Sequence, residues 1–292
     1  MRASEDDYMK YVSIGAFPNF MELKPQESAE AKVIYITGSR ESAEWVVRRL
    51  RAIGYQVDHP IEVEASSSAI EEAVRIYLNT CDLLIIVSRI EPGSAPVFEA
   101  VSSALGRPLV ENENARRLVE EYYYLYGMEE TSNKGVFNVP EEAKTLIMLP
   151  EGAIVFANPK GPAPAVLLEE EGKYILCVPG TLLEVAEILE DEIDSYLRGL
   201  LGMNLSVTVH IMTKTWDETL LKRVIEEVSE TAPWLFAQLK KSVFSREGWG
   251  VTVTVFSRSH DELYEKFAKG VRMVEDSLER RGVEYTRKNT DV

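Results

Sequence analysis

The feature that most constrains the fold of this chain is an alternation of apolar and amphipathic segments over residues 32–105. Residues 83–87 (LLIIV) are apolar throughout, as in a strand buried on both faces, and residues 33–37 (VIYIT) are similar. Residues 55–63 form a further candidate strand, which Pro60 interrupts in the manner of a sheet edge. Because a helical segment follows each of these strands, we expect an α/β fold with a doubly wound, mostly parallel sheet.

The later part of the chain predicts more strands and a second, smaller domain. Short strands are expected at residues 147–150, 153–156, 165–168 and 174–178, where they would form a hairpin-like insertion. After a glycine-containing linker at residues 199–202, the strand and helix patterns follow a βαββα-like order. We therefore divide the chain into an N-terminal extension (residues 1–30), a main domain (residues 31–201) and a small α+β domain (residues 204–292).

Four helix starts carry the capping-box pattern, in which Ser or Thr is followed three positions later by Glu. The pairs are Ser68 and Glu71, Thr181 and Glu184, Thr215 and Glu218, and Ser259 and Glu262. We expect a helix to begin at each of them.

The formal net charge of −16 is unevenly distributed. Residues 204–292 contain 14 basic and 14 acidic side chains, so the whole acidic excess lies before residue 204. Nucleic-acid binding is disfavoured, because phosphate contacts need clustered Lys and Arg. The apolar runs are shorter than the roughly 20 residues that span a bilayer, and the amino terminus does not resemble a signal peptide. We expect a cytoplasmic protein that binds neither nucleic acid nor membranes.

Cysteine and histidine usage predicts buried thiols and no metal site. Cys81 and Cys177 each lie in an apolar run. His59, His210 and His260 are far apart in the sequence and have no neighbouring ligands at zinc-site spacing. The chain has only three glutamines beside many Glu, Arg and Tyr residues, a composition typical of thermophilic proteins.

Residues 88–96 follow the most apolar strand and occupy the place where an open parallel sheet binds its ligand. Arg89 follows this strand and Arg40 follows the strand at 33–37; an arginine can bind an anion through two parallel hydrogen bonds. Further donors are expected from Ser39, Ser88, Ser94 and the helix start at Thr181. The alternative is that these arginines form surface ion pairs of little energetic value, Arg89 with Glu91 or Glu99 and Arg40 with Glu41 or Glu44.

Three motifs carry a resemblance to a known family. They are residues 104–109 (ALGRPL), residues 149–153 (LPEGA) with the proline-rich loop 158–164, and residues 177–180 (CVPG) with Glu184. Together they resemble the MoaB/Mog-type molybdopterin-binding-like domain at the amino end of the competence/damage-inducible protein A (CinA) family. Residues 204–292 are similar to the small α+β domain that follows it there. The resemblance implies that residues 31–201 are this domain.

The chain departs from the family pattern in two loops. Where such domains carry a Thr-Gly-Gly-x-Gly-Pro-Thr-x-Asp-Asp run, residues 87–96 read VSRIEPGSAP, and only Pro92 and, further on, Glu99 are kept. A Gly-Asn-Glu run is replaced by residues 38–42 (GSRES), which keep Gly38. The resemblance also implies that Lys160 and Gly180 lie beside the ligand. Replacing glycines by bulkier residues closes the backbone approach to a phosphate, and losing the acids removes ligands for a hard metal ion.

These patterns predict a protein that binds a nucleotide or another phosphorylated small molecule with little or no catalysis. Two alternatives remain open. One is a metal-dependent nucleotide pyrophosphatase of the ADP-ribose or dinucleotide type, with Glu91 or Glu99 as a metal ligand. The other is a non-catalytic subunit whose crevice Arg89 plugs. The sequence identifies no catalytic residue and no cofactor.

The tyrosine cluster near residue 124 is the one aromatic patch that could be mistaken for a stacking platform. Its members are Tyr122, Tyr123, Tyr124 and Tyr126. Acidic neighbours favour a role in packing or subunit contact, and we expect a homo-oligomer.

Overall fold

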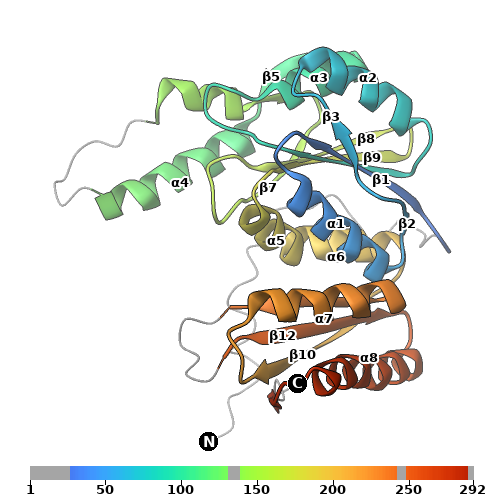
Figure 1. Ribbon diagram of the computed structural model, residues 1–292. Helices are drawn as coiled ribbons and strands as arrows, with labels where there is room; N and C mark the ends of the chain where they lie inside the picture. Colours follow the sequence, from blue (N-terminus) through green and yellow to red (C-terminus); the bar gives the residue numbers. More distant parts are fainter. Residues whose placement is uncertain (1–26, 131–138, 242–247, 289–292) are drawn as a thin grey trace, which may run out of the picture.

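A seven-stranded sheet forms the centre of the larger part of the molecule (Figure 1). In this computed structural model, which describes residues 27–130, 139–241 and 248–288, the strand order is β2-β1-β4-β9-β8-β7, and β3 also pairs with β1. The strands are β1 (Glu30–Ile36), β2 (Gln56–Val57), β3 (Ile61–Val63), β4 (Leu83–Ser88), β7 (Ile154–Phe156), β8 (Ala165–Glu170) and β9 (Lys173–Pro179). Strands β1, β2, β3, β4 and β9 are parallel, and β8 and β7 are antiparallel additions. The expected α/β fold with a doubly wound, mostly parallel sheet is confirmed.

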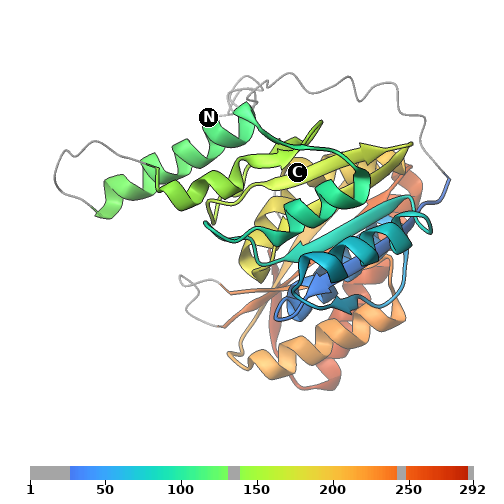
Figure 2. The same cartoon turned by 90° about the horizontal axis from the view of Figure 1, so that it is seen from above.

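Helices cover both faces of this sheet (Figure 2). One face is covered by α1 (Arg40–Ile53), α5 (Leu182–Glu190) and α6 (Glu192–Leu200). The other is covered by α2 (Ser67–Leu78), α3 (Pro96–Leu105), α4 (Glu113–Glu130) and the 3-10 helix η3 (Glu141–Leu146). Leu83, Ile85 and Val87 of β4 enter the first core, and Leu84 and Ile86 enter the second. Because both faces of β4 are buried, its sequence is apolar without alternation.

The predicted hairpin-like insertion at residues 147–178 is correct in part. Strands β7, β8 and β9 pair antiparallel with one another, but they belong to the main sheet. Strand β9 is an inner strand, parallel to β4, with Leu83 opposite Tyr174 and Ser88 opposite Pro179. Of the four predicted strands, β6 (Met148–Pro150) lies outside this sheet, paired with β5 (Leu109–Glu111) in a ribbon of its own. The sequence did not show the pairing of β9 with β4, because a short apolar strand looks the same whether or not it also pairs with a distant strand.

The second sheet is antiparallel, with the order β11-β12-β10-β13. Its strands are β10 (Leu205–Thr213), β11 (Leu235–Lys240), β12 (Gly250–Ser257) and β13 (Tyr285–Lys288), and its helices are α7 (Glu218–Thr231) and α8 (His260–Arg280). Apolar side chains of α7 and α8 share a separate core with this sheet. The element order is βαββα with β13 added, which agrees with the sequence pattern.

Two of the four predicted capping boxes begin helices as expected. The Thr181 hydroxyl accepts from Glu184 N at 3.3 Å and the Ser259 hydroxyl accepts from Glu262 N at 3.4 Å. In α2 and α7 the cap lies elsewhere: Ser66 caps α2, and Asp217 caps α7. Ser66 and Asp217 also carry a side-chain oxygen that can accept from a backbone N–H of the first helical turn. The local pattern alone therefore did not distinguish them from Ser68 and Thr215.

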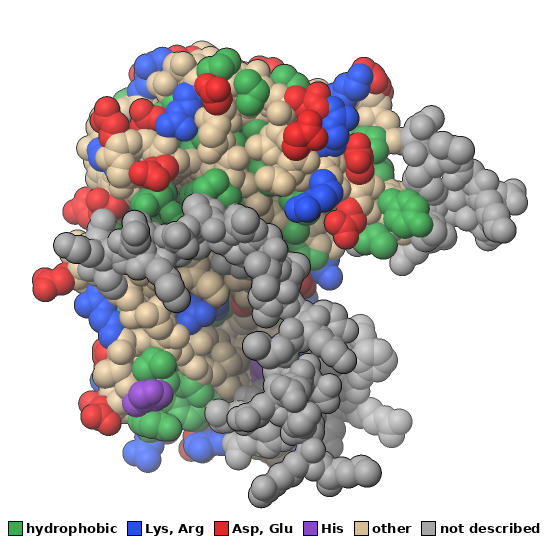
Figure 3. Space-filling model, turned by 180° about the vertical axis from the view of Figure 1, so that it is seen from behind, with side chains coloured by type: hydrophobic (Ala, Val, Ile, Leu, Met, Phe, Trp, Pro, Cys, Tyr) green, Lys and Arg blue, Asp and Glu red, His purple; other side chains and the backbone are tan. Residues whose placement is uncertain are grey.

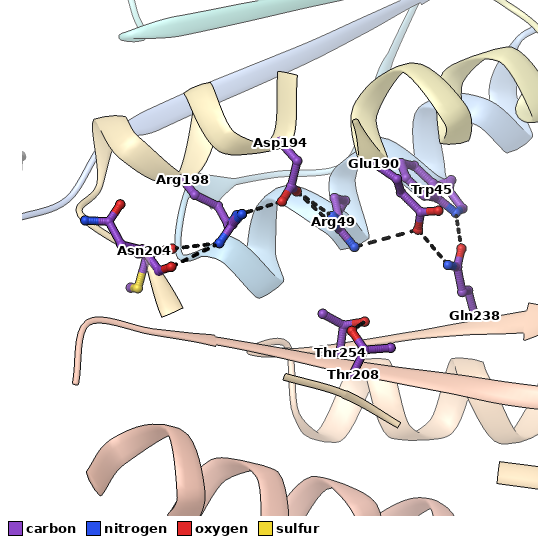
Figure 4. Close-up of polar contacts among 10 residues, drawn as sticks. Trp45, Arg49, Glu190, Asp194, Arg198, Asn204, Thr208, Gln238 and Thr254 are labelled. Atoms are coloured by element: carbon purple, nitrogen blue, oxygen red, sulfur yellow. Dashed lines mark hydrogen bonds and ion pairs between the residues drawn. The ribbon is translucent and has the colours of Figure 1, made fainter. Parts of the chain in front are cut away.

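The two sheets are joined through a buried polar network on α1 (Figure 4). The Arg49 guanidinium donates to Asp194 Oδ1 at 2.7 Å and lies over the rings of Phe236 and Phe256, with its Cζ atom 4.7 and 4.8 Å from their centroids. Trp45 packs edge-on against Phe236 at 5.1 Å between ring centroids. Arg49 and Asp194 are both buried, and both belong to helices of the larger part (α1 and α6). The contact with the second sheet is made by the Arg49 guanidinium and the Trp45 ring, which pack on its phenylalanine rings above this desolvated ion pair.

Helix α4 projects from the body of the molecule (Figures 1 and 2). Tyr123 packs against the second core, whereas Tyr124 and Leu125 are 52% and 54% exposed. In the view from behind, hydrophobic side chains gather near this end of the molecule (Figure 3). Among the described residues, no helix combines the length and the apolar composition needed to cross a membrane.

Two other predictions concern buried thiols and the amino terminus. Cys81 and Cys177 are free and buried, as expected. Most of the predicted N-terminal extension (residues 1–30) lies outside the described residues.

Candidate functional site

The carboxyl ends of β1, β4 and β9 lie side by side. Ligands of this fold bind outside these strand ends, and we call this region the crevice. Gly38 has φ +97°, a left-handed conformation that turns the chain from β1 into α1. Ser39 and Ser88 are buried at the ends of their strands, and Gly180 follows β9. A Cβ atom on Gly180 would lie 2.5 Å from Ser39 Oγ and 3.0 Å from Arg89 N. The structure therefore brings three predicted loops into direct contact.

Ser42 stabilises this contact, and its role was not predicted from the sequence. Its buried hydroxyl donates to Gly180 O at 2.7 Å and so ties the first turn of α1 to the turn after β9. A serine at the fourth position after the turn glycine gives no sequence signal of its own. The first backbone N–H groups of α1 and α5 have no partner within their helices, so two partially positive helix ends lie at this crevice.

Arg89 lies at the open side of the crevice, where it forms an exposed ion pair with Glu91. Its Nε donates to Glu91 Oε1 at 2.7 Å, and the two side chains are 78% and 55% exposed. An ion pair this exposed contributes little to stability, so an anionic ligand could displace Glu91 at small cost. The expected pairing of Arg89 with Glu91 is present, and it leaves the guanidinium at the rim.

Arg40 lies apart from this group. Its Nε donates to Glu44 Oε1 at 2.9 Å, and this hydrogen bond raises the pKa of the Arg40 guanidinium. The Arg40 side chain lines a pocket that α1 shares with α7. None of the other predicted site residues lines this pocket. The pairing with Glu44 is one that the sequence suggested.

Pro92 and Ser94 belong to a tight turn. Ser94 N donates to Glu91 O at 2.9 Å, and Gly93 N donates to Glu142 O at 2.8 Å, which fastens the turn to η3. Glu99 lies further on, exposed in the first turn of α3. The loop after β4 thus folds onto the second layer of helices, and only its first two residues reach the strand ends.

Asn158 and Thr181 are linked through Glu184 at the start of α5. The Thr181 hydroxyl and Asn158 Nδ2 both donate to the Glu184 carboxylate, the latter at 2.9 Å. Lys160 Nζ lies 3.7 Å from Glu187, on the next turn of the same helix. The proline-rich loop is therefore fixed beside the crevice, with its amide and lysine bound to carboxylates.

Two carboxylates beside the crevice already have partners. The Glu91 carboxylate is held by Arg89 and that of Glu184 by Thr181 and Asn158. In the part of the chain that the structure describes, no three His, Cys, Asp or Glu side chains lie close enough together to hold an ion.

Comparisons with known proteins identify the main domain. No family model matches the chain. Protein PAE0875 of Pyrobaculum aerophilum is 30% identical over 158 residues, which is 54% of this chain and 56% of that protein. A "Putative competence-damage inducible protein" of Alkaliphilus oremlandii is 27% identical over 158 residues, 54% of this chain and 36% of that protein. The matched region thus spans about half or less of these curated relatives.

The likeness extends to solved structures. CinA from Thermoplasma acidophilum, described as a protein with unknown function, aligns with a TM-score of 0.50 at 20% identity over 59% of this chain and 99% of its own. MoaB from Pyrococcus furiosus aligns at 12% identity over 60% of this chain and 99% of its own, with a TM-score of 0.35. The region shared with CinA has the size of the part of the chain that builds the seven-stranded sheet. This part resembles competence-damage inducible proteins in sequence and CinA in fold, and we refer to it as the CinA-like domain.

Proposed function

We propose that the CinA-like domain binds a nucleotide or another phosphorylated small molecule at the ends of β1, β4 and β9, with little or no turnover. The observation that carries this proposal is the meeting of Gly38–Ser39, Ser88–Arg89 and Gly180–Thr181 at two helix amino termini. Helix amino termini, hydroxyls and an exposed guanidinium are the groups that bind phosphate without a metal ion.

The close packing at Gly180 limits which part of a ligand can enter. Because Ser39 Oγ and the Arg89 backbone already touch this glycine, a phosphate cannot sit deep between the strands. The supported position is outside the strand ends, between Arg89 and the exposed start of α5 at Thr181. A ligand bound there remains open to water on one side, which favours recognition over catalysis.

The test is calorimetric titration of the full chain with ADP, ADP-ribose and ribose 5-phosphate, with and without Mg²⁺. We expect binding that Arg89→Ala weakens about tenfold, because a charge-assisted hydrogen bond to phosphate is lost. Arg75→Ala is the matched control, since Arg75 is also exposed and paired with a glutamate (Glu71) but lies on α2. Tighter binding to Arg89→Ala would instead show that Arg89 plugs the crevice.

The same samples distinguish binding from hydrolysis. Release of phosphate or of a nucleoside monophosphate at enzymatic rates in the presence of Mg²⁺ would contradict the proposal and favour a nucleotide pyrophosphatase. Loss of that activity in Glu91→Gln or Glu99→Gln would then identify the metal-binding carboxylate.

We also propose that the protein self-associates through α4. Tyr124 and Leu125 expose large apolar surfaces on this projecting helix. Light scattering should report an oligomer for the native chain and a smaller species for Leu125→Glu. Ile76→Glu, which alters an equally exposed side chain on α2, should leave the mass unchanged.

A further inference from the structure

A second pocket lies where α1 of the CinA-like domain faces α7 of the smaller domain. Its volume is about 350 Å³, and it is lined by the arginine-bearing face of α1, the end of α7 and the β2–β3 turn. This volume is in the range of small-molecule sites, which commonly occur between domains. The pocket is distinct from the strand-end crevice, since of the predicted crevice residues only Arg40 lines it.

Two polar atoms of this pocket are buried without a partner. Arg48 Nε on α1 and Ser229 Oγ on α7 have almost no solvent contact and make no hydrogen bond within the described protein. Among the described residues, these are the two buried side-chain polar atoms that lack a hydrogen bond. Arg48 and Ser229 both line this pocket. Buried donors are nearly always satisfied in native proteins, because leaving one unpaired costs about 1–3 kcal/mol.

The cationic side of the pocket is fixed in place. Arg51 Nε donates to Val57 O at 3.0 Å, so the guanidinium is held at the rim. Burial lowers the pKa of the Arg48 guanidinium, and the nearby carboxylates of Glu44 and Glu226 offset this effect only in part. Arg48 is therefore a desolvated cation whose charge the protein does not fully balance.

The opposite wall is acidic. Glu226 and Glu230 lie on the solvent-facing side of α7 and line the same pocket. Neither forms an ion pair within the described residues, whereas Glu44 is already bound to Arg40. Two arginines, Arg48 and Arg51, thus stand against two carboxylates across one pocket.

We propose that this pocket binds a small zwitterion, with its oxyanion at the guanidinium groups of Arg48 and Arg51 and its ammonium group at Glu226 and Glu230. The oxyanion balances the charge of Arg48, and the ammonium group matches the acidic wall. Since α1 and α7 belong to different sheets, the ligand bridges the two domains and stabilises their arrangement.

The experiment is calorimetric titration of the full chain with four probes at millimolar concentrations. O-phosphoethanolamine and L-aspartate each carry an ammonium group and an oxyanion, which is a phosphate in the first and carboxylates in the second. Inorganic phosphate carries only the oxyanion, and ethanolamine carries only the ammonium group. We expect at least one of the first two to bind at least tenfold more tightly than inorganic phosphate, and ethanolamine not to bind. Failure of both zwitterions to bind, or equal affinity for inorganic phosphate, would overturn the proposal.

Variants test the residues. Arg48→Met should weaken zwitterion binding about tenfold or more, because it removes a cation that holds the oxyanion. Ser229→Ala should leave binding unchanged, because Ser229 Oγ has almost no surface that a ligand can reach. Glu230→Gln should weaken the zwitterions but not inorganic phosphate. Arg75→Met is the control for losing an arginine elsewhere. Unchanged affinity in Arg48→Met would also overturn the proposal.

A stability measurement separates ligand binding from a structural role. If Arg48 serves a ligand, Arg48→Met should unfold at the same temperature as the native chain or a higher one in the absence of probe, because an unpaired buried donor is removed. A clear fall in midpoint would mean that Arg48 supports the fold. Arg89→Ala should leave zwitterion binding unchanged, because Arg89 does not line this pocket. The crevice proposal and the pocket proposal can therefore fail independently.

Discussion

At the scale of the residue, one arginine carries much of the contact between the two sheets. Arg49 is 6% exposed, bonds Asp194 through two nitrogens and lies over two phenylalanine rings of the second sheet. Asp194 in turn accepts from Arg198 at 2.6 Å. Asp194 thus pairs with two cations in a water-poor interface, and Glu190, 3.8 Å from Arg49, is a second and more exposed partner of Arg49.

Removing that carboxylate should be costly. We expect Asp194→Ala to lower the free energy of unfolding by about 3 kcal/mol, because it removes the nearest and buried counter-ion of Arg49 and leaves only Glu190, at 3.8 Å. Urea titration followed by circular dichroism measures this. Asp58→Ala, which removes an exposed partner of Lys32, is the control and should have little effect. Equal losses in both variants would show that burial of the pair is unimportant.

The two cysteines should be inert in the folded protein. Burial raises the pKa of the Cys177 thiol to about 12 and that of Cys81 to about 11, so almost no thiolate exists at pH 8. A chromogenic disulfide reagent should label neither residue in native protein and both in guanidinium chloride. Rapid labelling of Cys177 before unfolding would contradict its placement in the core.

The contacts of exposed residues could be predicted from the sequence better than the contacts of buried residues. The pairs of Arg89 with Glu91 and Arg40 with Glu44 were among the alternatives it offered, because near neighbours of opposite charge restrict the choice. The buried, unpaired Nε of Arg48 was not foreseeable, since its burial depends on how α1 faces α7, which is far away in the sequence. The contact of Ser42 with Gly180 was missed for the same reason.

At the scale of the element, the turn after β9 is the tightest feature of the crevice. We expect Gly180→Ala to destabilise the protein by about 1–3 kcal/mol, because its Cβ would lie 2.5 Å from Ser39 Oγ and 3.0 Å from backbone atoms of β4. Thermal unfolding measures the change.

A second glycine provides the control for this substitution. Gly199 lies in α6 with nothing within 4 Å of an added Cβ, so Gly199→Ala should stabilise the protein by up to about 1 kcal/mol. If both substitutions moved the midpoint in the same direction, the crowding at Gly180 would not be the cause.

Elements with a strong local pattern were predicted well. The all-apolar segment at residues 83–87 became β4, and Ser259 and Thr181 begin helices as their capping boxes indicate. Strand β11 belongs to the predicted βαββα-like order, but its residues were not assigned, because they follow α7 closely and fit either a helix or a strand. Residues 55–63 formed two short strands, β2 and β3, instead of one interrupted strand.

At the scale of the whole molecule, the interface makes the two sheets one cooperative unit. Trp45 and Arg49 connect α1 to the second sheet, and Gln238 Nε2 donates to Glu190 at 2.6 Å across the same boundary. We expect urea unfolding curves from tryptophan fluorescence and far-ultraviolet circular dichroism to coincide. Three of the four tryptophans lie beyond residue 204, so a smaller domain that unfolds alone would separate the two curves.

The placement of β9 has a consequence for synthesis of the chain. Strand β4 pairs on one side with β1, but its other neighbour arrives only with residues 173–179. While the ribosome is still making the intervening residues, one edge of the most apolar strand in the sheet stays open to other nascent chains. Translation speed through this interval should therefore influence the yield of native protein.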